Sequence, residues 1–171
     1  MLKYFKFFTL SLSLLFLSCS SIVHKKNLQL SNNKTYAISS FWNYTETPMA
    51  GLRAASIVES VLSKESLNII SFINGNEKKS TKQNKNLFLE EEVNKAKRLN
   101  IDYLVMGEVQ EWRYKTGIDG EPVVSYSIKV IEIQSGRVLF NAVGAKSGWG
   151  HKSIGIIAQE IAATLIPQFV N

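Results

Sequence analysis

The chain has 171 residues, of which 45% are hydrophobic and 20% are charged, and its formal net charge is +6 at pH 7. This length is enough for one domain that buries most of its apolar surface. The single cysteine excludes an intrachain disulfide, and with only two histidines the chain cannot build a Cys/His zinc cluster.

Residues 1–18 have the pattern of a secretory signal peptide. Two lysines precede an apolar run that extends to Leu17, and this run is too short for a membrane-spanning helix, which needs about 20 residues. Small Ser18 then precedes Cys19, the only cysteine. A cleavage point at a cysteine resembles a bacterial lipoprotein signal. An ordinary cleaved signal with a leftover thiol is the alternative.

A lipoprotein signal implies that Cys19 becomes the lipidated N-terminus, and this covalent lipid, such as palmitate, is the only cofactor we expect. Ser20 resembles the sorting preference for the outer membrane. The following stretch is polar and has no periodic apolar pattern, which predicts a flexible tether over residues 19–34 with a reach of about 50 Å at full extension. The tether would hold a periplasmic domain, residues 35–171, close to the membrane.

Four lysines fall in the polar segment 74–86 against a single glutamate. The segment is either a solvated loop or a contact with anionic lipid headgroups. We do not expect nucleic acid as a partner, because a secreted chain without a basic face or a stacking platform of aromatics lacks the features of such proteins. The lysines concerned are Lys78, Lys79, Lys82 and Lys85.

The apolar pattern in the first half of the domain predicts two strands, at 35–41 and 68–73, joined through a helix. Thr47 and Pro48 are typical of a helix N-cap and first position. A second helix is predicted over 86–99. The inward face of the first helix would carry Ala54, Ile57, Val58, Val61 and Leu62, and that of the second Leu89, Val93, Ala96 and Leu99.

The second half predicts three long strands, at 102–115, 122–133 and 137–147, and a final helix from about Ser153. In the middle strand Val124, Tyr126, Ile128 and Val130 alternate with polar residues. The order β-α-β-α-β-β-β-α indicates a single α/β (α+β) domain with a mixed sheet flanked by helices.

Motifs of catalysis are nearly absent from the sequence. No G-x-S-x-G nucleophile elbow is present. The glycine-rich stretch 144–155 follows a strand and precedes a helix, but its spacing does not match a phosphate-binding loop, so we expect its glycines to allow a tight turn into the helix. We therefore predict a protein that is not an enzyme, with no catalytic residues and no metal site.

Two clusters remain as candidate contact sites. Trp149 stands between two glycines, so it is either an aromatic lid on its own domain or an exposed anchor for a membrane or a partner subunit. The turn within 111–122 carries Asp119 and Glu121. These carboxylates are either solvated turn residues or groups that line a path for a cationic ligand.

These clusters, together with the leader, carry a family resemblance. The sequences EWRYKTGIDGEP (111–122) and KSGWG (146–150) resemble PelC lipoproteins of Pel exopolysaccharide export. The similarity covers most of residues 35–170. The chain is similar more broadly to the CsgG and LpoB group of envelope lipoproteins.

The resemblance implies a CsgG/LpoB-like fold and a lipid-anchored periplasmic ring of identical subunits under the outer membrane. Such a ring would contact an outer-membrane barrel exporter and a cationic polysaccharide of the biofilm. Trp149 matches the family's membrane-facing tryptophan, and Asp119 and Glu121 are candidates for an acidic lining. The alternative function is that of an LpoB-like lipoprotein activator of a peptidoglycan synthase.

Overall fold

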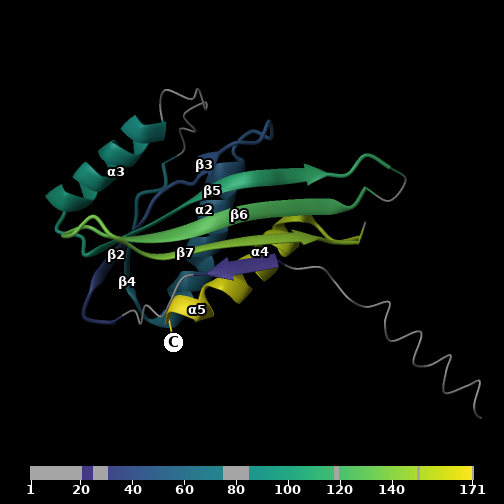
Figure 1. Ribbon diagram of the computed structural model, residues 1–171. Coiled ribbons are helices and arrows are strands. Elements are labelled where there is room, and N and C mark those ends of the chain that lie inside the picture. The colour runs from purple at the N-terminus through teal and green to yellow at the C-terminus, as the bar shows by residue number, and fades with distance from the viewer. Residues whose placement is uncertain (1–20, 25–30, 75–84, 118–119, 150, 171) are drawn as a thin grey trace, which may run out of the picture.

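The computed structural model describes residues 21–24, 31–74, 85–117, 120–149 and 151–170 (Figure 1). A seven-stranded sheet has the order β1-β7-β6-β5-β2-β4, and β3 pairs with β5. The strands are β1 (Ser21–His24), β2 (Thr35–Ile38), β3 (Trp42–Asn43), β4 (Asn68–Ser71), β5 (Tyr103–Tyr114), β6 (Pro122–Glu132) and β7 (Val138–Ser147). The helices are α2 (Ala50–Leu62), the 3-10 turn η2 (Ser63–Glu65), α3 (Lys85–Arg98), α4 (Ile154–Leu165) and α5 (Pro167–Val170).

The sheet joins a parallel half to an antiparallel half. Strand β2 pairs in parallel with β4 and with β5, and the connections run through α2 and α3. Strands β5, β6 and β7 form an antiparallel meander, whose second turn places Gly136 at a φ of 69°, as its left-handed bulge position requires. The structure therefore confirms the predicted α+β fold and mixed sheet, and adds the short strands β1 and β3.

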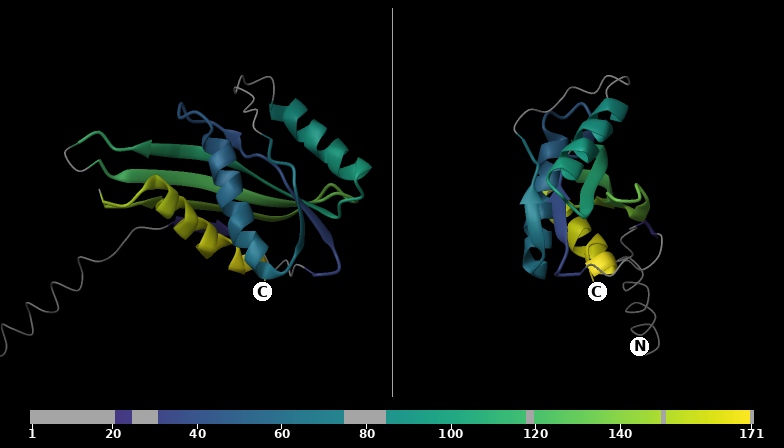
Figure 2. Two further views of the ribbon diagram at one scale, coloured as in Figure 1. Left: turned by 180° about the vertical axis from the view of Figure 1, so that it is seen from behind. Right: turned by 90° about the vertical axis from the view of Figure 1, so that its left-hand side faces the viewer.

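Helices α2 and α4 cover one face of the sheet (Figure 2). The side chains of β6 that were predicted to share a face, such as Tyr126 and Ile128, are fully buried beneath these helices. At Gly51, helix α2 lies close to the backbone of Phe41, and an added Cβ there would lie 2.0 Å from the Phe41 carbonyl oxygen. Close packing on this face thus depends on a residue without a side chain.

A β-bulge in β5 adjusts which side chains reach this core. The register of β5 against β6 shifts between Val109 and Glu111. As a result Val109 and Trp112, which are three residues apart, both lie in the core under α2 and α4. Simple alternation would have placed them on opposite faces, because successive strand residues point to opposite sides.

Helix α3 lies on the opposite face, over a second and smaller apolar cluster (Figure 2). Its buried residues are Glu92 and Ala96, and Phe88 packs partly against Trp42, with ring centroids 5.6 Å apart. The predicted inward stripe is therefore partly wrong, since Leu89 and Leu99 are exposed. The helix packs over the start of β5, where Leu104 and Met106 belong to its cluster, and Leu89 lies beside an open part of β5 and β6.

The predicted start of α2 is also corrected. The helix begins at Ala50, and its N-cap residue is Met49 in a left-handed conformation with no side-chain cap. Thr47 instead donates a hydrogen bond from its hydroxyl to the Trp112 carbonyl oxygen at 2.5 Å. Because the Thr47 hydroxyl joins this segment to β5, it is not available to the helix.

The predicted tether contains a strand. Residues Ser21–His24 pair with β7 in antiparallel register, with Ser21 opposite Ala145 and His24 opposite Ala142. The β-branched residues Ile22 and Val23 favour this extended conformation, and β7 offers them an edge. Residues 21–24 are therefore fixed to the sheet, which corrects the prediction of a flexible tether for these four residues.

Candidate functional site

Three segments meet at one end of the molecule, which we call the tip. It comprises the ends of β5 and β6 at Tyr114 and Pro122, the turn after β7 and the start of α4, and in Figure 1 it lies on the right. Strand β1 begins at the same end, because Ser21 lies opposite Ala145 near the end of β7. The tip thus brings together the start of the described chain and the segment that carries Trp149.

Trp149 is 73% exposed, so the alternative of a lid packed on its own domain is wrong. Two further apolar side chains at the tip are half exposed, Tyr114 at 50% and Ile156 at 48%. The Tyr114 hydroxyl accepts a hydrogen bond from the Ile154 backbone N–H at 3.2 Å, which ties β5 to the start of α4. Exposed aromatic and aliphatic groups of this kind are typical of contact surfaces for lipid or protein.

The turn that presents Trp149 is held on both sides. The Gly148 backbone N–H donates to the Pro122 carbonyl oxygen at 2.9 Å, and the Lys152 N–H donates to the Trp149 carbonyl oxygen at 2.9 Å. A Cβ at Gly148 would lie 2.6 Å from the Cδ1 atom of Ile157, so a larger residue here would require the Ile157 side chain to shift. The turn is therefore built by backbone contacts, which leave the indole of Trp149 uncovered.

Helix α4 begins directly after this turn. The Ser153 hydroxyl accepts a hydrogen bond from the Ile156 backbone N–H at 3.3 Å and so caps the helix. Two lysines bind Glu160 from either side, with Lys146 Nζ at 2.9 Å and Lys152 Nζ at 2.8 Å from its carboxylate oxygens. Hydrogen bonds from Lys146 and then Lys152 lower the pKa of Glu160. These pairs connect β7, the turn and α4.

The acidic candidates have different outcomes. Asp119 lies outside the described residues. Glu121 binds Lys115, with 2.7 Å between the carboxylate oxygen and Nζ, and the Lys115 backbone N–H donates to the Glu121 carbonyl oxygen. The Glu121 charge is thus partly neutralised by a neighbour across the turn, and its role toward a ligand stays a prediction.

Of the four lysines predicted to contact a membrane or a partner, only one lies within the described residues. Lys78, Lys79 and Lys82 lie outside the described residues, as does Cys19. Lys85 is the first residue of α3, and its Nζ lies 3.0 Å from Glu108 and 2.7 Å from the Tyr44 hydroxyl. Its ammonium group is therefore directed toward the sheet.

The described residues contain no group of three or more His, Cys, Asp or Glu side chains arranged to hold a metal ion. In the same part of the chain, no helix combines the length and hydropathy needed to cross a bilayer. Sequence reasoning missed Tyr114 and Ile156 at the tip. The available signal was the position of Tyr114, an aromatic residue that directly precedes a polar turn.

Comparisons with known proteins give structural relatives only. No protein-family model and no curated protein matches the chain. Two crystal forms of the PelC dodecamer from Paraburkholderia phytofirmans superpose with TM-scores of 0.75 and 0.74 at 28% sequence identity. Each match covers 88% of this chain and 98% of that chain.

A more distant likeness concerns the fold alone. Lipoprotein GNA1162 from Neisseria meningitidis has a TM-score of 0.59 at 12% identity and covers 79% of this chain and 96% of that chain. PelC, in contrast, is similar in sequence as well as in fold. The resemblance to PelC that the sequence indicated is thereby confirmed, and this chain has the PelC fold over nearly the whole length of that protein.

Proposed function

We propose that this chain is a lipid-anchored, non-enzymatic subunit of an oligomeric ring on the periplasmic face of the outer membrane. The ring assists the export of a cationic exopolysaccharide through an outer-membrane barrel. The likeness to PelC supports the assignment to exopolysaccharide export, and the dodecamers of PelC support self-association.

The placement of Trp149 is the observation that carries the proposal. Cys19 precedes Ser21 by two residues, and two residues reach at most about 7 Å. Since Ser21 pairs opposite Ala145, an acyl chain on Cys19 would lie near the end of β7. The exposed indole of Trp149 follows that end by two residues. The lipid anchor and the amphipathic indole of Trp149 would therefore contact the bilayer at the same place.

Charge near the tip fits a contact with an anionic membrane surface. Lys146 and Lys152 flank Trp149 along the chain, and within the described residues they share one carboxylate, that of Glu160. Each additional positive charge near an anionic bilayer favours attachment. The lysines 78, 79 and 82 and the acidic lining at Asp119 and Glu121 stay part of the proposal as further contacts to lipid and to polysaccharide.

The first experiment tests the tip in a strain that lacks its own copy of the gene. The full lipoprotein with Trp149→Ala should restore little polysaccharide export, while the purified variant keeps the melting temperature of the wild type. Leu87→Ala is the matched control, because Leu87 is also an exposed apolar residue but lies on α3. Export at the wild-type level by Trp149→Ala would contradict the anchor role.

The second experiment concerns the lipid and the ring. Cys19→Ser should remove the protein from the outer-membrane fraction, and light scattering of the detergent-solubilised wild type should give the mass of an oligomer. A monomer at all protein concentrations would contradict the ring, and an unacylated mature terminus in mass spectrometry would contradict the anchor.

The alternative function, activation of a peptidoglycan synthase, is weaker. Activators that cross the cell-wall space from the outer membrane need a long free tether. Here the pairing of β1 with β7 fixes residues 21–24 to the domain and shortens the reach from Cys19.

A further inference from the structure

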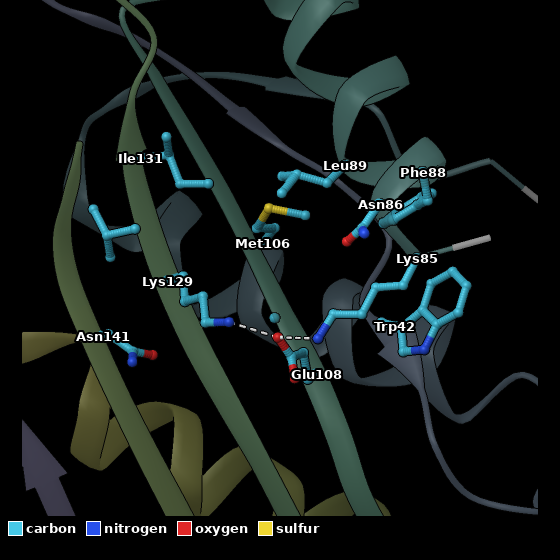
Figure 3. A pocket seen from close by; sticks show the side chains of 12 residues that line it. Trp42, Lys85, Asn86, Phe88, Leu89, Met106, Glu108, Lys129, Ile131 and Asn141 are labelled. Carbon is cyan, nitrogen blue, oxygen red and sulfur yellow. Dashed lines mark hydrogen bonds and ion pairs between the residues drawn. The ribbon is translucent and has the colours of Figure 1, made fainter. Parts of the chain in front are cut away.

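A cleft lies on the sheet face opposite α2 and α4, between α3 and strands β5 to β7 (Figure 3). Its volume is about 620 Å³, within the range of roughly 300–1,000 Å³ that is usual for ligand pockets. The proposed function does not use it. The lining residues are Trp42, Lys85, Asn86, Phe88, Leu89, Met106, Gly107, Glu108, Lys129, Ile131, Val138 and Asn141.

One part of the cleft is apolar. Met106 and Ile131 form its floor from β5 and β6, and Leu89 approaches from α3 (Figure 3). Leu89 is exposed and Val138, on β7, is 50% exposed, so both keep apolar surface in contact with solvent at the cleft. An exposed apolar surface beside a hollow indicates a binding site for an apolar group.

The other part of the cleft is charged. A single oxygen of Glu108, Oε1, lies 2.5 Å from Lys129 Nζ and 3.0 Å from Lys85 Nζ (Figure 3). Two ammonium groups therefore share one carboxylate, which leaves an excess of one positive charge. The amides of Asn86 and Asn141 line the same cleft and can donate further hydrogen bonds.

The charged group is held in place by the fold. The side chain of Glu108 is only 17% exposed, and those of Lys85 and Lys129 are 37% and 30% exposed. Lys85 also donates to the Tyr44 hydroxyl at 2.7 Å. The ammonium groups are thus positioned before any ligand arrives, as an anion-binding site requires.

We propose that this cleft binds an amphiphile, in which an acyl chain lies against the Met106, Ile131 and Leu89 side chains and an anionic head group lies against Lys85 and Lys129. The net positive charge disfavours a cationic sugar, and the apolar floor disfavours a fully polar anion. A free fatty acid and an anionic phospholipid share this chemistry, an acyl chain joined to an anionic group. They differ in the anionic group, carboxylate or phosphate, in the number of acyl chains and therefore in mass.

A photo-cross-linking experiment tests the proposal on the full chain in cells. The cells receive a palmitic acid analogue with a diazirine and an alkyne, which enters phospholipids and the free fatty acid pool. After irradiation, adducts on the purified protein are mapped by peptide mass spectrometry. We expect them on peptides of α3, β5 and β6 around Leu89, Met106 and Ile131. The adduct mass distinguishes a fatty acid from a phospholipid.

Two variants sharpen the result. Val138→Glu places a carboxylate at the rim of the apolar part and should lower cleft labelling about tenfold. Lys129→Gln leaves Lys85 alone with Glu108, which removes the excess positive charge, and should lower labelling severalfold. Leu99→Glu is the matched control, since Leu99 is exposed but does not line the cleft. Circular dichroism checks that each variant is folded.

Three results would overturn the proposal. One is labelling confined to peptides outside the cleft lining. Another is equal cleft labelling in wild type, Val138→Glu and Lys129→Gln. The third is a cleft adduct that is linked only to the Cys19 peptide, since the occupant would then be the protein's own anchor. The first two results do not depend on ring formation or export and leave the proposed function standing. The third would also count against the membrane anchor, but not against the ring or its part in export.

Discussion

The two faces of the sheet differ in how completely helices cover them. Under α2 and α4, side chains such as Ile128 and Phe140 are buried in one continuous core. On the opposite face α3 covers only part of the strands, and Glu108, Lys129 and Val138 border an open cleft. The covered face supplies the burial that stabilises the fold. The open face can therefore contain charged side chains and a cleft without disrupting the core on the other face.

The largest effect should come from a truncation on the covered face. Ile128 has no exposed surface, so Ile128→Ala should lower the free energy of unfolding by about 2–5 kcal/mol through lost burial and a cavity. Urea denaturation of the purified periplasmic domain measures it. A loss below about 1 kcal/mol would mean that this face is not the tightly packed one.

A smaller effect should come from the charged group of the open face. Glu108→Gln leaves Lys85 and Lys129 close together without their shared carboxylate, and should lower the free energy of unfolding by about 1–3 kcal/mol. Glu111→Gln is the control. Glu111 pairs with Arg113 in an exposed position, where the loss should be about 0–1 kcal/mol. Equal losses in the two variants would show that Glu108 is as well solvated as Glu111.

The pH dependence of stability should single out the same carboxylate. Burial acts to raise the pKa of Glu108, but hydrogen bonds from Lys129 and Lys85 outweigh burial and hold the pKa below the ordinary value of 4.5. A lowered folded-state pKa stabilises the protein above pH 4.5, and this stabilisation is lost as the pH falls through the folded-state value.

Urea denaturation at several pH values from 7 to 3 checks this expectation. The difference in unfolding free energy between wild type and Glu108→Gln should be constant near neutral pH and shrink below about pH 4.5. Glu111→Gln serves again as the control. A difference that stays constant down to pH 3 would show that the lysines do not stabilise the ionised form of Glu108.

The sequence predicts the covered face better than the open one, and the reason is physical. The alternation of Tyr126 and Ile128 with polar residues marks the buried side of β6 directly. The charged part of the cleft exists because Glu108 of β5 lies near Lys129 of β6, and this neighbourhood is set by the register between the two strands. The bulge between Val109 and Glu111 alters this register, and no residue pattern marks it.

The remaining differences arise where a tertiary contact overrides a local signal. Thr47 resembles an N-cap, but its hydroxyl binds the Trp112 carbonyl oxygen instead. Lys85 falls in a polar segment of the sequence, but in the structure it begins α3 and pairs with Glu108. The glycine neighbours of Trp149 raise the question of its exposure but do not answer it, because the backbone hydrogen bonds that hold the turn leave no residue pattern in the sequence.

The smallest effect should come from a truncation at the rim of the open face. Val138 is 50% exposed, so Val138→Ala should change the free energy of unfolding by no more than about 0.5 kcal/mol. Urea denaturation of both Val138→Ala and Ile128→Ala compares the loss of unfolding free energy for two β-branched side chains on neighbouring strands. A loss above about 1.5 kcal/mol would show that the apolar rim is packed in solution. The contrast between a closed face that stabilises the fold and an open face available to a ligand would then fail, because the cleft would be occupied by the protein itself.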